Sequence, residues 1–216
     1  MGKLDQTSNI NSLITGYHTF KTEHAMQKEL YEQLIEHGQQ PKALMIACCD
    51  SRVDPAIVTH CEPGELFMVR NVANLVPPFD VDPRHHGTSA ALEFAVVGLE
   101  IKDIIVFGHR YCGGIRALMQ SDESSNGSNF IRTWMNIAKP AKQQVLADYP
   151  QSSLDEQAHH CEKASLIISL NNLKTFPWIK ARVAEGELTL HGWYFDLKTG
   201  QIQRYNENTQ SFEELK

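Results

Sequence analysis

The sequence predicts an α/β fold in which helices flank a central, mostly parallel β-sheet. Short, continuous apolar runs recur along the chain, and such runs are typical of strands that are covered on both faces. Stretches with helical periodicity alternate with these runs, which favours a parallel sheet. We expect about four parallel strands, an antiparallel edge strand and an N-terminal helical arm.

The N-terminal part of the chain is predicted to begin with a helix and to continue with strands. Apolar residues recur among charged ones over 15–37, which predicts an amphipathic helix that ends near Gly38 and Pro41. We interpret this helix as an arm that packs on a partner subunit. A second helix is expected over 88–99. Strands are predicted at 43–48, 66–70 and 104–108.

The C-terminal part is predicted to be mostly helical before it returns to strands. The expected elements are a helix after Gly113 and Gly114, a loop rich in Ser, Asn and Gly over 121–129, helical stretches through Lys139 and over 154–174, and strands at 188–195 and 201–206. The turn at Thr199 and Gly200 is expected to pair the last two strands.

The length of 216 residues and the lack of an internal repeat or linker predict one domain over 1–216. Within it we distinguish an arm over 1–40, a core over 41–120 that carries the candidate site, and C-terminal helices and last strands over 121–216.

Composition and charge limit which partners and which cellular compartment we expect for this protein. The net charge is -6 and no run is rich in Lys or Arg, which argues against nucleic acid as a partner. The N-terminus lacks the apolar core of a signal peptide, and no apolar stretch reaches the roughly 18 residues of a membrane span. The five cysteines are an odd, sparse set that is typical of reduced thiols. We therefore expect a cytoplasmic protein without a membrane partner.

Chemically active side chains follow two of the predicted strands, at the edge where α/β sheets bind their ligands. Cys48 and Asp50 come at the end of the first strand, and His109 and Cys112 follow the third. Because side chains alternate along a strand, Cys48 and Asp50 are expected to point the same way, with Cys49 in the opposite, core-facing layer.

Two thiolates and one imidazole are ligands that suit Zn²⁺, and three protein ligands leave the fourth position that a catalytic zinc needs. Cys112 opens a helix, where the free amides and the dipole favour the thiolate. For an isolated His and Cys three residues apart, the better interpretation is a pair of buried small residues. The occurrence of both features at strand ends weakens that interpretation.

Three motifs resemble the β-class carbonic anhydrases: C-x-D-S-R at 48–52, G-E-L-F-x-V-R-N-V-A-N-L-V-P-P at 64–78, and G-H-x-x-C-G-G-I at 108–115. The resemblance extends from Gln39 to about Asp196. It implies one Zn²⁺ per chain at Cys48, His109 and Cys112, with Asp50 either on the metal or paired with Arg52. The implied reaction is the reversible hydration of carbon dioxide to bicarbonate by zinc-bound hydroxide.

The resemblance also implies a narrow apolar substrate pocket between two chains of a homodimer or homotetramer. The positions that match its lining are Gln39, Phe67, Val72, Phe94 and the amide of Gly113. For each apolar one, packing in the core is about as good an interpretation. Relatives often have Tyr where this chain has Phe94.

Some bacterial relatives carry a second, regulatory bicarbonate pocket built with a Trp and a Tyr. This chain has Met45 and Phe195 at those places, and the segment N-N-L-K-T-F-P-W-I at 171–179 is close to a plant-type pattern. The resemblance therefore implies a plant-type-like member without the regulatory pocket.

Two alternatives remain open at this point. The nearest alternative is the same zinc site used on another small electrophile such as carbon disulfide, which differs in access to the pocket more than in ligands. The other is a non-enzymatic zinc or redox-sensing protein, in which the thiolates are closed off or oxidised. A second metal site at 85–86 or 159–161 is disfavoured, because these histidines fall in a polar loop and on a helix face.

Overall fold

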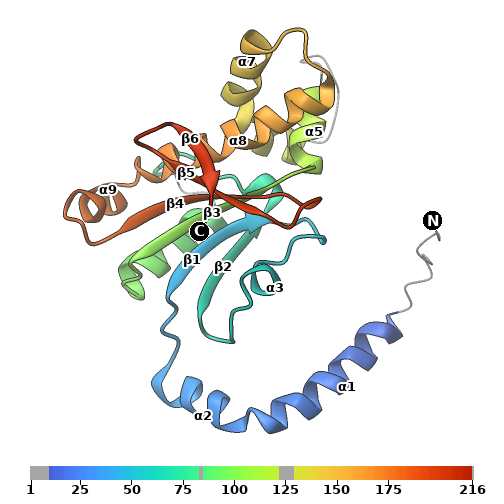
Figure 1. The fold of residues 1–216 in the computed structure, drawn as a ribbon. Helices are drawn as coiled ribbons and strands as arrows, with labels where there is room; N and C mark the ends of the chain where they lie inside the picture. The colour runs from blue at the N-terminus through green and yellow to red at the C-terminus, as the bar shows by residue number, and fades with distance from the viewer. Residues whose placement is uncertain (1–9, 83–84, 122–128, 216) are drawn as a thin grey trace. The chain divides into compact units, whose positions relative to one another are not determined.

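The structure is a computed structural model that describes residues 10–82, 85–121 and 129–215. It divides into two compact units, Met1–Gln40 and Pro41–Lys216 (Figure 1). Most of the loop expected over 121–129 lies outside the described residues.

The N-terminal unit consists of two helices, α1 (Asn11–Met26) and α2 (Lys28–His37), where the sequence predicted one helix over 15–37. The single-helix prediction was wrong because the backbone of Gln27 leaves the helical region at φ -103° and ψ 20°. The N–H of Gln27 still donates to the carbonyls of Glu23 and His24, so the first helix is closed before the second begins. Gly38, with φ 71°, ends α2.

The second unit is built on a six-stranded sheet in the order β2-β1-β3-β4-β5-β6. The first four strands along the chain pair in parallel, and β5 and β6 are added by antiparallel pairing. The strands are β1 (Ala43–Cys48), β2 (Leu66–Asn71), β3 (Asp103–His109), β4 (Thr189–Phe195), β5 (Ile202–Asn206) and β6 (Ser211–Glu214). The α/β fold with a mostly parallel sheet is thus confirmed. The prediction of one antiparallel strand missed β6, whose sequence S-F-E-E holds only one apolar residue.

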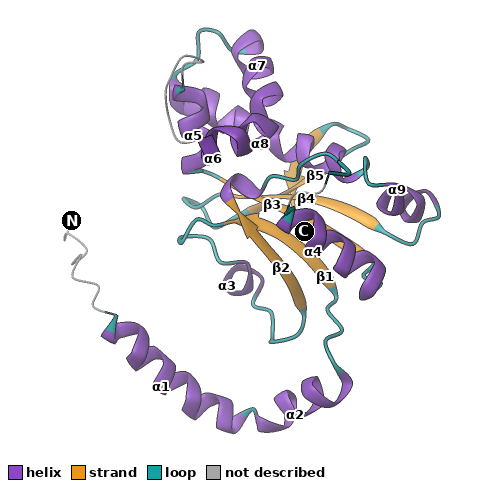
Figure 2. Ribbon diagram, turned by 180° about the vertical axis from the view of Figure 1, so that it is seen from behind, coloured by secondary structure: helices purple, strands orange, loops and turns teal. Residues whose placement is uncertain are grey.

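Helices and short helical turns connect and flank these strands (Figure 2). They are α3 (Pro55–Thr59), the 3₁₀ turn η1 (Val72–Asn74), α4 (Gly87–Glu93), the π-helical turn η2 (Phe94–Gly98), α5 (Gly113–Gln120), α6 (Asn129–Met135), the 3₁₀ turn η3 (Asn136–Ala138), α7 (Lys139–Asp148), α8 (Leu154–Leu173) and α9 (Pro177–Ala184). In the described part of the chain, no helix is both long and apolar enough to cross a membrane.

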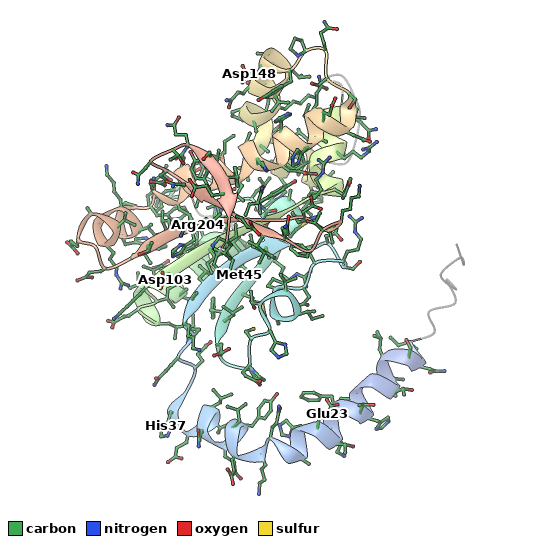
Figure 3. All side chains as sticks on the ribbon, viewed as in Figure 1. Glu23, His37, Met45, Asp103, Asp148 and Arg204 are labelled. Atoms are coloured by element: carbon green, nitrogen blue, oxygen red, sulfur yellow. The ribbon has the colours of Figure 1, made fainter. Side chains whose placement is uncertain are left out.

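The side chains of β1 alternate between two buried layers. Leu44 and Ile46 belong to an apolar cluster with Leu92 of α4 and Leu166 of α8. Met45, labelled in Figure 3, belongs to a different cluster on the strand's other face. Because both faces of β1 are covered, all six of its residues are buried, as a continuous apolar run predicts.

The register of the parallel strands brings the chemically active residues to one edge of the sheet. In the pairing of β1 with β3, Ala47 lies opposite Phe107, so Cys48 and His109 end neighbouring strands. Helix α8 then packs against β3 and β4. Its start is fixed by a reciprocal capping box between Ser153 and Glu156.

A first prediction concerns the contact between α8 and β4 at Gly192. A Cβ there would lie 2.5 Å from Leu166 Cδ2, 2.9 Å from Leu170 Cδ1 and 3.2 Å from Tyr205 Cβ. We expect Gly192→Ala to lower the free energy of unfolding in urea by about 1–3 kcal/mol, because the packed core must shift. Gly87→Ala is the matched control, since no atom lies within 4 Å of its Cβ position. Equal stability of the two variants would contradict this packing.

Candidate metal centre

The side chains of Cys48, His109 and Cys112 meet in a buried cluster. One possible ligand atom from each lies within 4.8 Å of the others. Cys48 ends β1, His109 ends β3 and Cys112 precedes the first turn of α5. Three residues that the sequence places on two strands and a helix start therefore face one point.

The spacing of the two sulfurs suits a shared cation. Cys48 Sγ and Cys112 Sγ are 4.0 Å apart, and both cysteines are free. In a tetrahedral zinc site with Zn–S bonds of about 2.3 Å, two sulfurs stand about 3.8 Å apart. The sulfurs thus already have nearly the separation that two zinc-bound thiolates adopt.

The ring of His109 is held with one nitrogen free to bind a cation. Its Nδ1 lies 2.9 Å from the carbonyl oxygen of Arg110. A carbonyl only accepts hydrogen bonds, so Nδ1 carries the hydrogen and Nε2 of the neutral ring carries the lone pair. Nε2 is buried without a hydrogen-bond partner. Burial of an unpaired polar atom is costly, and coordination of a cation removes that cost.

The contact between the two thiols affects their pKa values in opposite directions. The hydrogen bond from Cys112 lowers the pKa of Cys48. The same contact, together with burial, raises the pKa of Cys112. A dication held between the two side chains would stabilise both as thiolates. These two thiols and the imidazole fit Zn²⁺ in ligand type, burial and spacing.

Asp50 lies beside the cluster but is paired with Arg52. Arg52 Nε donates to Asp50 Oδ1 at 2.9 Å and its Nη2 donates to Oδ2 at 2.7 Å. This bidentate pair lowers the pKa of Asp50 to about 2, chiefly through the hydrogen bond from the guanidinium. Oδ2 stands 3.9 Å from His109 Nε2. The structure thus shows the Asp50–Arg52 pair, one of the two arrangements that the resemblance implies.

Cys49 corrects a sequence prediction. We expected its side chain to point into the core opposite Cys48, but Cys49 is exposed. Side chains alternate between the two faces only along the strand itself, and β1 ends at Cys48. Cys49 is therefore the first residue of the loop and not the last of the core.

The structure brings together some of the residues expected to line a pocket. The rings of Phe67 and Phe94 stack with centroids 5.8 Å apart, and Phe94 is 51% exposed. Val72 Cγ1 lies 2.9 Å from the Cβ position of Gly114, so Val72 sits against the start of α5. No atom lies within 4 Å of the Cβ position of Gly113, which leaves that side open.

Gln39 stands apart from these residues in the chain. It belongs to the N-terminal unit, beyond the end of α2, and its side chain is exposed. Its part in the pocket rests on the resemblance alone.

Arg70 is a site residue that the sequence analysis missed. Its Nε donates to the carbonyl of Cys48 at 3.0 Å, and its Nη2 donates to those of Asp50 and Val53, both at 2.8 Å. One guanidinium thus fixes the loop that carries the first sulfur and the carboxylate. The available signal was an arginine at the end of the apolar run L-F-M-V-R.

Glu162 of α8 is a second missed residue, buried at 4% exposure, whose carboxylate accepts a hydrogen bond from the N–H of Cys112 at 3.0 Å. A charged residue on the buried face of a helix was the available signal.

The other histidine clusters do not form a comparable site. His86 Nε2 pairs with Asp82 at 2.7 Å, and the ring of His160 stacks on Tyr149 with centroids 3.8 Å apart. Among the residues whose positions are described, the cluster of Cys48, His109 and Cys112 is the only group of three or more His, Cys, Asp or Glu with metal-ligand spacing.

Comparison with known proteins gives one consistent result. The family model described as "Carbonic anhydrase" matches residues 43–202. "Beta carbonic anhydrase 5, chloroplastic" of Arabidopsis thaliana is 45% identical over 168 residues, which is 78% of this chain and 55% of that protein. This chain thus spans little more than half the length of that relative.

Solved structures give the same result. The β-carbonic anhydrase CcaA superposes with a TM-score of 0.90 at 33% identity, over 96% of this chain and all of that chain. A structure from work on two tetrameric β-carbonic anhydrases of the ascomycete Sordaria macrospora superposes with a TM-score of 0.79 at 28% identity, over 90% of this chain and 95% of that one.

A second prediction tests the metal centre by comparing a cysteine inside the cluster with one outside it. Cys112→Ser replaces a buried sulfur of the cluster, and we expect protein purified under reducing conditions to lose its zinc, which elemental analysis measures. Cys49→Ser is the matched control, because Cys49 is exposed and outside the cluster, and one zinc per chain is expected to remain. Equal zinc content in the two variants would show that Cys112 is not a ligand.

Proposed function

This chain belongs to the β-carbonic anhydrase family, and on that premise we propose that it catalyses the reversible hydration of carbon dioxide to bicarbonate and a proton. The observation that carries the proposal is the buried cluster of Cys48, His109 and Cys112 beside an ionised Asp50. These three side chains would hold one Zn²⁺ per chain. When bound, Zn²⁺ lowers the pKa of water and makes it nucleophilic near neutral pH.

Asp50 and Arg52 are proposed to orient the reacting water. The carboxylate is ionised and lies against the cluster, so it can accept a hydrogen bond from that water and aim a lone pair at the carbon of carbon dioxide. Arg52 occupies both oxygens of Asp50, which favours an acceptor beside the cation over a fourth ligand on it. Arg52 also donates to the carbonyl of Tyr111 at 2.9 Å and so ties this pair to the turn before Cys112.

Gln39, Phe67, Val72, Phe94 and Gly113 are proposed to form the substrate pocket. Carbon dioxide carries no charge and suits an apolar wall such as the stacked rings of Phe67 and Phe94. As carbon dioxide accepts the oxygen of water, negative charge develops on its own oxygens. The amide of Gly113, a residue with no atom within 4 Å of its Cβ position, is proposed to donate to that charge.

The assembly is proposed to be a homodimer or homotetramer. Phe94 and Val97 are 51% and 58% exposed, and their burial against a second copy would enclose the pocket. The exposed Leu13, Ile14 and Tyr17 of α1 give the arm an apolar surface for a partner subunit. The tetrameric relatives from Sordaria macrospora support this proposal.

The organisation and compartment of the chain are also proposals. We propose that residues 1–216 act as one domain, with 1–40 as the arm, 41–120 as the zinc-site core and 121–216 as the C-terminal part. A cytoplasmic location is supported by five free cysteines, which a reducing compartment maintains.

A third prediction tests the role of Asp50. We expect Asp50→Asn to keep its zinc but to lower kcat for carbon dioxide hydration about 10²- to 10⁴-fold in stopped-flow assays, because the neutral amide is a poorer proton acceptor. Asp155→Asn is the matched control, since Asp155 pairs with Arg116 at the exposed start of α8. It is expected to keep full activity.

Two outcomes would count against this assignment. Wild-type activity in Asp50→Asn would remove Asp50 from the reaction. Faster release of sulfide from carbon disulfide than hydration of carbon dioxide, measured on the same wild-type preparation, would assign the site to the other substrate.

A fourth prediction concerns pH. The apolar side chains of Met45 and Phe195 offer bicarbonate no hydrogen-bonding group of the kind that Trp and Tyr provide. Because water must lose one proton before it attacks, we expect kcat to rise with pH along a single, non-cooperative ionisation. A cooperative collapse of activity below neutral pH, with an inactive form that bicarbonate stabilises, would contradict the absence of a regulatory pocket.

A further inference from the structure

The carboxylate of Glu162 is buried against the turn that carries two of the metal-binding residues. Its side chain is 3% exposed. Oε1 accepts the N–H of Cys112 at 3.0 Å, and Oε2 accepts the hydroxyl of Tyr194 at 2.6 Å. Nη1 of Arg110 lies 3.5 Å from Oε2 and supplies the opposite charge. A buried carboxylate needs this full set of partners, and two of them come from the turn itself.

The turn over 109–112 has an unusual backbone. Tyr111 is a non-glycine residue at φ 63°, in the left-handed region that side chains disfavour. Such a conformation persists only where neighbouring contacts maintain it. At one end of the turn, Nδ1 of His109 donates to the carbonyl of Arg110. At the other end, the N–H of Cys112 donates to Glu162.

Tyr194 completes the support from the far side of the carboxylate. It is 1% exposed, and burial together with the nearby Glu162 raises the pKa of its hydroxyl, so it remains a donor. His159 Nδ1 lies 2.9 Å from the same hydroxyl and connects it to a partly exposed side chain. The position of Glu162 is thus fixed by β4 and α8, both outside the turn that it contacts.

We propose that Glu162 is a positioning residue for the metal centre: its buried carboxylate, held by Tyr194 and Arg110, maintains the left-handed turn at Tyr111 and so keeps Cys112 Sγ and His109 Nε2 aimed at one ion. This inference rests on the proposed function only in taking Zn²⁺ as that ion. Glu162 touches neither the sulfurs nor the ring nitrogen that bind the ion. Its effect is expected on metal affinity and ligand geometry.

The test compares wild type with Glu162→Gln, which keeps a carbonyl oxygen for the N–H of Cys112. Its NH₂ group, however, is a donor that cannot accept from Tyr194 or Arg110. The zinc dissociation constant, measured by competition with a chromophoric chelator under reducing conditions, is expected to rise about 10- to 100-fold. The sulfur-to-metal absorption band of the Co²⁺-substituted protein is expected to shift, because the Cys112 sulfur moves.

Leu173→Ala is the matched structural control. Leu173 lies in the apolar core on the same helix, eleven residues beyond Glu162, and is 0% exposed. Its truncation is expected to lower the melting temperature without changing zinc affinity or the Co²⁺ spectrum. The inference is overturned if folded Glu162→Gln binds zinc as wild type does. It is equally overturned if Leu173→Ala loses as much zinc affinity at a similar loss of melting temperature.

Tyr194→Phe decides the matter if Glu162→Gln does not fold. It removes one donor to Glu162 and keeps the ring in the core, and weaker zinc binding with an altered Co²⁺ spectrum supports the inference, whereas wild-type values refute it. Failure of the proposed function looks different. In that case the wild-type chain itself binds no zinc, or binds zinc without hydrating carbon dioxide.

Discussion

One buried nitrogen imposes the main constraint on this structure. His109 Nε2 is buried near two thiols without a hydrogen-bond partner, at the end of a strand that is buried along nearly its whole length. The other parts of the site place two sulfurs beside this nitrogen, so that one cation can contact all three atoms. The parallel pairing of β1 and β3 brings Cys48 beside it, and the short turn after β3 brings Cys112. A polar atom that has no partner within the protein would be satisfied by a cation held at this point.

The charged side chains around the cluster are paired with one another, so the two sulfurs stay available to a cation. Asp50 is neutralised by Arg52, Glu162 by Arg110, and the loop between Cys48 and Val53 is held by Arg70. Each of these carboxylates is thus paired with an arginine, Asp50 through two hydrogen bonds and Glu162 through one close contact. A carboxylate beside the metal then serves as a hydrogen-bond acceptor, which is a different role from that of a ligand.

The sequence predicted those parts of the molecule that depend on local pattern. Continuous apolar runs located β1, β2 and β3, and the positions of Cys48 and His109 at strand ends followed from them. Features that depend on contacts between distant segments were missed. The strand β6 is paired with β5 without an apolar run of its own, and the break at Gln27 interrupts a continuous helical pattern. Alternation also failed for Cys49, because the strand ends one residue earlier.

Arg70 and Glu162 show why the support of a site is harder to predict than its ligands. Arg70 lies in the motif at 64–78, but the motif does not say which backbone groups its guanidinium holds. Glu162 lies in none of the three motifs and follows Cys112 by 50 residues. A ligand type is recognisable from its own chemistry, whereas a supporting residue is defined by what it touches. The burial of a charged side chain on a helix is a signal only once the buried face of that helix is known.

Helix α8 explains how the strained backbone near the cluster is maintained. Ala73 and Asn74 have positive φ angles of 64° and 47°, and Tyr111 has 63°, so two segments near the sulfurs contain left-handed backbone at non-glycine residues. Ser169 bonds to the first of these segments, accepting the N–H of Val76 at 3.2 Å.

Glu162 bonds to the second segment through the N–H of Cys112. Residues seven apart lie on one face of a helix, two turns from each other. A single face of α8 therefore supports both strained segments at once. Its rigid position, set by the capping box at Ser153 and by packing on the sheet, determines where the ligands point.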